Sequence, residues 1–101
     1  MKLKLGIKDK HIFEGERANP QNCAIARALK DKIRNITKVG VFPENVYLVV
    51  KKNKKETLAY KGDLTKTAAA FIKRFDEGKP VYGFNLNLTL KPVNTYIKQL
   101  A

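Results

Sequence analysis

Seven consecutive positions near the end of the chain constrain the fold most, because apolar and polar side chains alternate there without exception. The apolar positions are Phe84, Leu86, Leu88 and Leu90, and the positions between them are Asn85, Asn87 and Thr89. Successive side chains of a β-strand point to opposite faces, so this pattern predicts a strand with one face in the core and one in water. The chain is therefore expected to form a sheet with one solvated face.

Other segments share the strand pattern. Leu3, Leu5 and Ile7 alternate with Lys2, Lys4 and Gly6, which predicts a first half-buried strand. Segments 46–50 and 57–60 are rich in β-branched and aromatic residues, and the lysine-rich stretch between them contains Asn53, a residue that suits turns. A hairpin is predicted there. Segment 39–42 is a short apolar run that stops at Pro43.

Helical signals lie between these strands. A short helical turn is predicted over 10–14, with Asp9 as its cap, Gly15 as its end, and Ile12 and Phe13 turned inward. A longer helix is predicted from Pro20, with Asn19 as N-cap. Its apolar stripe comprises Ile25, Leu29, Ile33 and Ile36.

A last helix is predicted after Asp63, which would cap it, and Gly78 and Pro80 are placed to end it. Its apolar face comprises Leu64, Ala68, Phe71, Ile72 and Phe75. The order strand, helix, hairpin, helix, strand predicts one α+β domain over 1–92, followed by a tail over 93–101. Two helices are expected on one face of a mostly antiparallel sheet.

This order also fits the ferredoxin-like fold that the RNA-recognition motif uses. That module stacks bases on aromatic side chains of two central strands. Here the third predicted strand has only Tyr60 and the first has no aromatic residue, so the signature is absent.

Charge is the main indication of function. The net charge is +12 and the pI is about 10, which gives a potential that attracts polyanions. The charge is spread along the chain, with +6 in residues 1–40, +3 in 41–62 and +3 in 63–101. Lysine outnumbers arginine 17 to 4, and lysine is also the common residue of a merely solvated surface, so solubility is the alternative explanation of the charge. The scarcity of arginine, which binds phosphates and bases through two hydrogen bonds, counts against nucleic-acid binding.

Two groups of basic residues are candidate binding sites for nucleic acid or an acidic partner. The first is the hairpin tip, defined as Lys51, Lys52, Lys54 and Lys55, with Tyr47 or Tyr60 nearby to stack on a base. The alternative is a solvated turn whose lysines discourage aggregation of strand edges. The second group is the helix face formed by Arg27, Lys30 and Arg34, with Asp31 partly neutralising Arg27; the alternative is an ordinary solvated face.

Catalysis and metal binding have little support in the sequence. His11 and Cys23 are the only residues of their types, and no spacing typical of a metal site or Gly-rich phosphate loop occurs. The chain is therefore predicted not to be an enzyme and to need no cofactor. A single cysteine, no apolar run long enough to span a bilayer and no secretory signal together predict a cytoplasmic protein.

Three short motifs, together with the alternating strand from Phe84, resemble a known family. The motifs are H-I-x-x-G at 11–15, C-x-I-A-x-A-L at 23–29 and F-I-x-x-F-D-x-G-x-P at 71–80. In this order they resemble small uncharacterised proteins encoded by bacteriophages and prophages. The resemblance implies a protein made inside a bacterium, and one that binds nucleic acid or a host protein. It supplies no catalytic residues.

Two functions are therefore expected from different classes. The first is a phage-type accessory protein that binds nucleic acid through backbone phosphates, without sequence readout. The alternative is an effector that modulates a host or anti-phage defence protein through a basic surface, with Asn85, Asn87 and Thr89 or a sheet edge as contact. A virion component is a third reading. Membrane binding is the weakest, because neither longer helix has a bulky aromatic insertion stripe.

Overall fold

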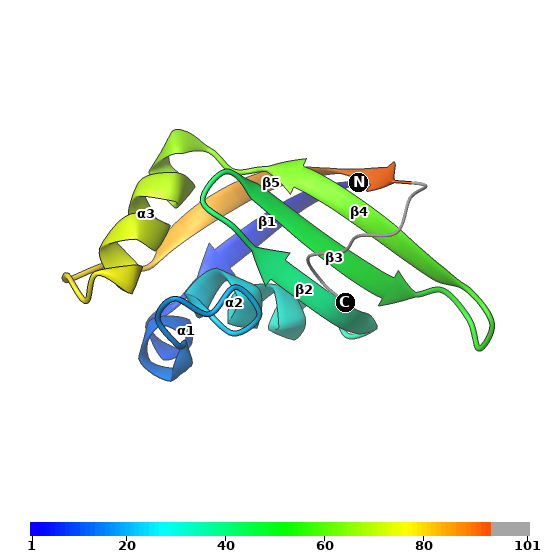
Figure 1. Ribbon diagram of the computed structural model, residues 1–101, viewed down its shortest axis with the longest axis horizontal. Helices are drawn as coiled ribbons and strands as arrows, with labels where there is room; N and C mark the ends of the chain where they lie inside the picture. Colours follow the sequence, from blue (N-terminus) through cyan, green and yellow to red (C-terminus); the bar gives the residue numbers. More distant parts are fainter. Residues whose placement is uncertain (94–101) are drawn as a thin grey trace.

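The alternating segment lies in strand β5 (Phe84–Val93), which is paired on both sides in the computed structural model. The structure describes residues 1–93. The other strands are β1 (Lys2–Ile7), β2 (Ile36–Val41), β3 (Asn45–Lys51) and β4 (Thr57–Asp63). They form one curled sheet in the order β1-β5-β4-β3-β2, and every neighbouring pair is antiparallel (Figure 1). The predicted α+β class with an antiparallel sheet is confirmed.

The ferredoxin-like version of this class is not formed. That topology places its first strand in the centre of the sheet, between the third and the last, whereas here β1 pairs with β5 alone and β2, β3 and β4 follow one another as a meander. Strand β1 is left at the sheet edge, where Lys2 lies opposite Thr89 of β5. Short local turns favour pairing between consecutive strands, and the first and last strands of the described region then pair with each other.

Strand β2 was not predicted as a strand, and Ile36 was assigned to a helix. The reason is a bulge: Ile36 lies opposite Val50 and Lys38 opposite Val49, so Thr37 is an extra residue. The extra residue interrupts the two-residue alternation by which a strand is recognised. The predicted apolar run 39–42 contains the second half of this strand.

Three helices pack against the sheet: α1 (Asp9–Glu14), α2 (Ala24–Lys32) and α3 (Lys66–Asp76). Helix α2 begins four residues later than predicted, with Cys23 at the N-cap. The Oδ1 atom of Asn19 accepts a hydrogen bond from the amide of Gln21, so Asn19 stabilises a turn instead of the helix. The carbonyl of Pro20 accepts a bond of 2.8 Å from the Val41 amide, which ties this turn to β2.

Helix α3 also starts after a different cap. The Oγ1 atom of Thr65 accepts a hydrogen bond from the amide of Ala68 at 3.1 Å, whereas Asp63 is the last residue of β4. Gly78 ends the helix as predicted, in the left-handed conformation with φ of 73°. The Gly78 amide bonds the carbonyl of Phe75 and the Lys79 amide bonds the carbonyl of Arg74, as in a Schellman motif.

Helix α1 has Lys8, and not Asp9, at its N-cap. His11 takes the buried position and Ile12 is partly buried as predicted, but Phe13 is 91% exposed. Two residues along a helix correspond to a rotation of about 200°, so the chain cannot turn both His11 and Phe13 toward the core. The prediction of an inward Phe13 is wrong for this reason.

The helices cover the inner face of the sheet, and one apolar core lies between. Helix α2 contacts both edge strands, β1 and β2, and so fills the opening of the curled sheet (Figure 1). The largest fully buried side chains are Ile25, Leu29, Val46, Leu48, Leu86, Leu88 and Leu90. Within residues 1–93 the outer face of the sheet is left to solvent. Strand β5 runs through Pro92 to Val93, and the rest of the predicted tail lies outside the described residues.

Candidate nucleic-acid interface

The outer face of the sheet collects lysines from all five strands. The strand register places Tyr47 opposite Lys61, and Lys61 opposite Lys91, in one row across β3, β4 and β5. The lysines at outward strand positions are Lys2, Lys4, Lys38, Lys51, Lys61 and Lys91. Among the described strand residues, Asp63 is the only acid. We call this surface, with its six lysines, the basic sheet face.

Tyr47 is the aromatic side chain available on the basic sheet face. The Lys61 Nζ lies 5.7 Å from the centre of its ring, a cation–π distance, and Phe42 contacts it edge-on with ring centres 5.8 Å apart. Tyr60 is on the opposite side of β4 and packs against the core. Of the two predicted stacking residues, the structure therefore leaves only Tyr47 on the solvated face.

The predicted hairpin between β3 and β4 is confirmed, and its tip is built around Asn53. The Oδ1 atom of Asn53 accepts hydrogen bonds of 2.9 Å from the amides of Lys55 and Glu56, which close the turn. All four tip lysines are exposed. Lys52 lies 3.8 Å from Glu56 in a solvated ion pair, so the segment remains strongly positive.

The predicted helix face divides into two parts. The Asn35 side-chain amide donates to the Lys51 carbonyl at 2.8 Å, and this contact brings the neighbouring Arg34 beside the base of the hairpin. Arg34 follows the end of α2. The structure thus places the chain next to Arg34 at the base of the hairpin, whereas Arg27 and Lys30 lie on α2.

Arg27 and Lys30 are already occupied by other groups. The Arg27 guanidinium donates to Glu14 Oε2 at 2.8 Å and to Asn22 Oδ1 at 3.0 Å. The Lys30 Nζ donates to the Gln21 carbonyl at 2.7 Å. The expectation that Asp31 neutralises Arg27 is wrong, because the ion pair of Arg27 is formed with Glu14.

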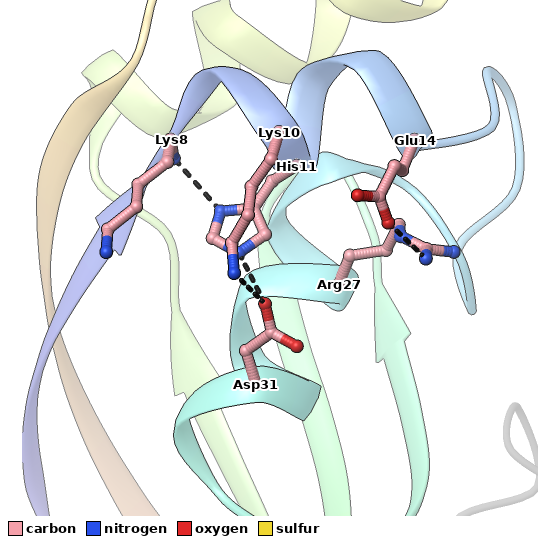
Figure 2. A network of polar contacts seen from close by, with 6 residues as sticks. All are labelled: Lys8, Lys10, His11, Glu14, Arg27 and Asp31. Atoms are coloured by element: carbon pink, nitrogen blue, oxygen red, sulfur yellow. Dashed lines mark hydrogen bonds and ion pairs between the residues drawn. The ribbon is translucent and has the colours of Figure 1, made fainter.

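Asp31 instead joins α2 to α1 through His11 (Figure 2). The Lys8 amide donates to His11 Nδ1 at 3.0 Å, so the ring proton lies on Nε2, which donates to Asp31 Oδ2 at 2.8 Å. Lys10 Nζ lies 3.3 Å from the same oxygen. The hydrogen bond from His11, and then that from Lys10, lowers the pKa of Asp31 below its usual value.

This arrangement fastens two helices together and offers no reactive group. Both ring nitrogens of His11 are engaged, so neither is free to act as a base or to bind a metal. Cys23 is buried at the start of α2, and burial raises the pKa of its thiol, which disfavours the reactive thiolate. Among residues 1–93, no three His, Cys, Asp or Glu side chains gather as metal ligands would.

The basic sheet face could not be predicted from the sequence pattern alone. The outward positions of Lys2, Lys4 and Lys91 follow from alternation, but which residues of neighbouring strands meet depends on a register that no single strand encodes. Asn85, Asn87 and Thr89, predicted as a protein contact, are exposed on this same face. The contacts proposed for two different functions therefore share one surface.

Comparisons of the chain with protein-family models, with curated proteins and with solved structures found no match. No helix within the described part of the chain is long and apolar enough to span a membrane. The resemblance to phage-encoded proteins stays a prediction.

Proposed function

We propose that the protein binds nucleic acid through its backbone phosphates, with the basic sheet face and the hairpin tip as the contact surface. The observation that carries this proposal is the gathering of six lysines at outward positions of five adjacent strands, with one acid among them. Adjacent strands lie about 4.8 Å apart, so these ammonium groups repel one another in the free protein. Phosphates neutralise them and release the counterions of the polymer.

The composition of this surface favours binding without sequence readout. Lysine offers a compact charge to any phosphate, whereas base reading relies on bidentate side chains. Tyr47 supplies a single ring on which a base can stack, and every base has such a face. Affinity is therefore expected to depend on salt and length more than on sequence. A phage-type accessory protein of this kind would act inside a bacterium.

Fluorescence anisotropy with labelled oligonucleotides tests the proposal. The tip variant carries Gln at Lys51, Lys52, Lys54 and Lys55. Its matched control carries Gln at Lys32, Lys66, Lys73 and Lys79, which lie on or just beyond the helices and lose the same charge. We expect micromolar or tighter binding near 150 mM salt, and a salt slope in the tip variant that is smaller by about 3 to 4.

The control variant is expected to keep the slope of the original protein. Binding that is seen only at low salt, and that both variants weaken equally, would show general attraction to a basic protein and would overturn the proposal.

A second candidate function, as an effector that binds a host protein, is favoured by a different surface. Phe13 is 91% exposed and lines a hollow of about 410 Å³ together with Ile12, Phe75, Pro80 and Val81. Tyr82, the next residue, is 80% exposed. The hollow is also lined by the basic side chains of Arg17 and Lys79. Exposed aromatic side chains beside a hollow of mixed apolar and basic character are typical of protein contacts. If this function holds, Phe13→Ser and Tyr82→Ser will abolish capture of one identified partner while oligonucleotide binding is unchanged.

A further inference from the structure

We infer that a hollow on the basic sheet face, between β4 and β5, is the subsite that holds one phosphodiester group of the bound nucleic acid. The inference rests on the proposed function and assigns it a location. The hollow has a volume of about 670 Å³. Its side chains that bear charge or hydrogen-bonding groups are Lys61, Asp63, Thr65, Asn87, Thr89 and Lys91.

The hollow exists because two neighbouring strands separate. Strands β4 and β5 pair only where Ala59 to Gly62 face Val93 to Leu90, and the remainder of β5 pairs with β1 alone. After Asp63 the chain turns away into α3. Gly62 is an inward position of β4, where a Cβ would lie 2.9 Å from Leu90 Cδ2 and 3.0 Å from the Thr89 carbonyl, so glycine lets β4 and β5 pair closely on the core side of the hollow.

Two lysines lie opposite each other at the floor of the hollow, and in the free protein the Lys61 Nζ lies 5.7 Å from the centre of the Tyr47 ring on β3. Lys61 and Lys91 are direct cross-strand partners on the same face, a placement that is unfavourable for like charges. Neither is within 4.0 Å of a carboxylate in residues 1–93. An anion between the two ammonium groups replaces repulsion by two attractive contacts.

Uncharged donors complete the site. The exposed side chains of Asn87 and Thr89 lie on the adjoining part of β5, on the same face as Lys91. The Thr65 hydroxyl accepts from the Ala68 amide and keeps its own proton for donation. Asp63 is the one acid in the lining, so the side chains sum to a single positive charge. That sum suits the single negative charge of a phosphodiester better than the higher charge of a free phosphate.

An NMR titration locates the site directly. The amide signals of Gly62, Thr89 and Lys91 are followed as a thymidine decanucleotide, or inorganic phosphate at the same concentration, is added to the protein. We expect the decanucleotide to shift these signals at 150 mM salt and inorganic phosphate to shift them much less.

A double variant, Lys61→Gln with Lys91→Gln, tests the two charges. We expect roughly tenfold weaker decanucleotide binding at 150 mM salt and a salt slope smaller by about 1 to 2. The matched control, Lys32→Gln with Lys73→Gln, loses the same charge from the helices and is expected to change affinity less than twofold. The double variant should also melt at a higher temperature in low salt, because its like-charge pair is gone; this excludes misfolding as the cause of weaker binding.

The outcomes separate this inference from the proposed function. If the decanucleotide binds and the double variant matches its control, the subsite is wrong and the proposed function stands. If no oligonucleotide binds at 150 mM salt, the proposed function is wrong. The subsite for a phosphodiester of that nucleic acid is then wrong as well, whatever inorganic phosphate does.

Discussion

At the scale of single residues, His11 shows why residue type does not determine role. A lone histidine with a lone cysteine in the same chain invites a catalytic reading. In the structure its Nδ1 accepts from the Lys8 amide and its Nε2 donates to Asp31, while Cys23 is buried elsewhere in the core. The sequence could not predict this contact, because His11 and Asp31 are 20 positions apart and the chain between them contains a turn that replaces the expected start of the helix.

The pKa of Asp31 gives this contact a pH dependence. Its folded pKa is lowered from 3.8 by the His11 hydrogen bond, so the contribution to stability is present above about pH 4 and is lost as pH falls through the folded pKa. The carboxylate is exposed, so we expect Asp31→Asn to lower the free energy of unfolding at pH 7 by less than about 1 kcal/mol.

Urea unfolding of the original protein and of Asp31→Asn from pH 7 to pH 2.5 measures this effect. The difference between the two is expected to shrink below about pH 4, as the carboxylate becomes protonated. A difference that stays constant over the whole range would show that the charge of Asp31 contributes nothing.

At the scale of elements, periodicity predicted the existence of elements well and their ends poorly. The strict alternation in β5 and the apolar stripe of α3 both depend on side chains that face one core, and both predictions are confirmed. The predicted starts of α2 and α3 were wrong. Several residues near each start can cap a helix, and the sequence does not show which of them the folded backbone will place at the N-cap. Strand β2 was missed because its bulge breaks the alternation.

Thr65 gives a test at this scale. Thr65→Ala removes the acceptor for the Ala68 amide at the start of α3, and we expect the free energy of unfolding to fall by about 1 kcal/mol. Thr67→Ala is the matched control, since Thr67 is exposed inside the same helix. It is expected to be neutral or slightly stabilising, because alanine has the higher helix propensity. Equal loss in both variants, by urea denaturation, would contradict Thr65 as the cap.

At the scale of the whole molecule, the total charge was available from the sequence and its arrangement was not. Alternation alone places Lys91 on an outward face, but only the pairing of β4 with β5 brings Lys61 opposite it. The candidate site depends on the order and register of five strands. Strand order and register follow from long-range packing and cannot be derived from composition.

The net charge of +12 also predicts how stability responds to salt. Self-repulsion of a highly charged chain destabilises its compact state, and added salt screens it. We therefore expect the melting temperature to rise between 10 mM and 300 mM sodium chloride by several degrees. The control is the Lys61→Gln, Lys91→Gln variant, whose rise should be smaller. A melting temperature independent of salt would show that these charges are already neutralised within the protein.

The pairing of the first strand, β1, with the last described strand, β5, affects the order in which the sheet can fold. Lys2 lies opposite Thr89, so the edge of the sheet closes only after almost the whole described chain is available. The β2–β3–β4 meander needs only short loops and can form earlier during synthesis. Until β5 arrives, β4 presents an unpaired edge and β1 has no strand with which to pair. Folding is therefore expected to be slow for a chain of this size, in milliseconds to seconds, with its late step set by the arrival of β5.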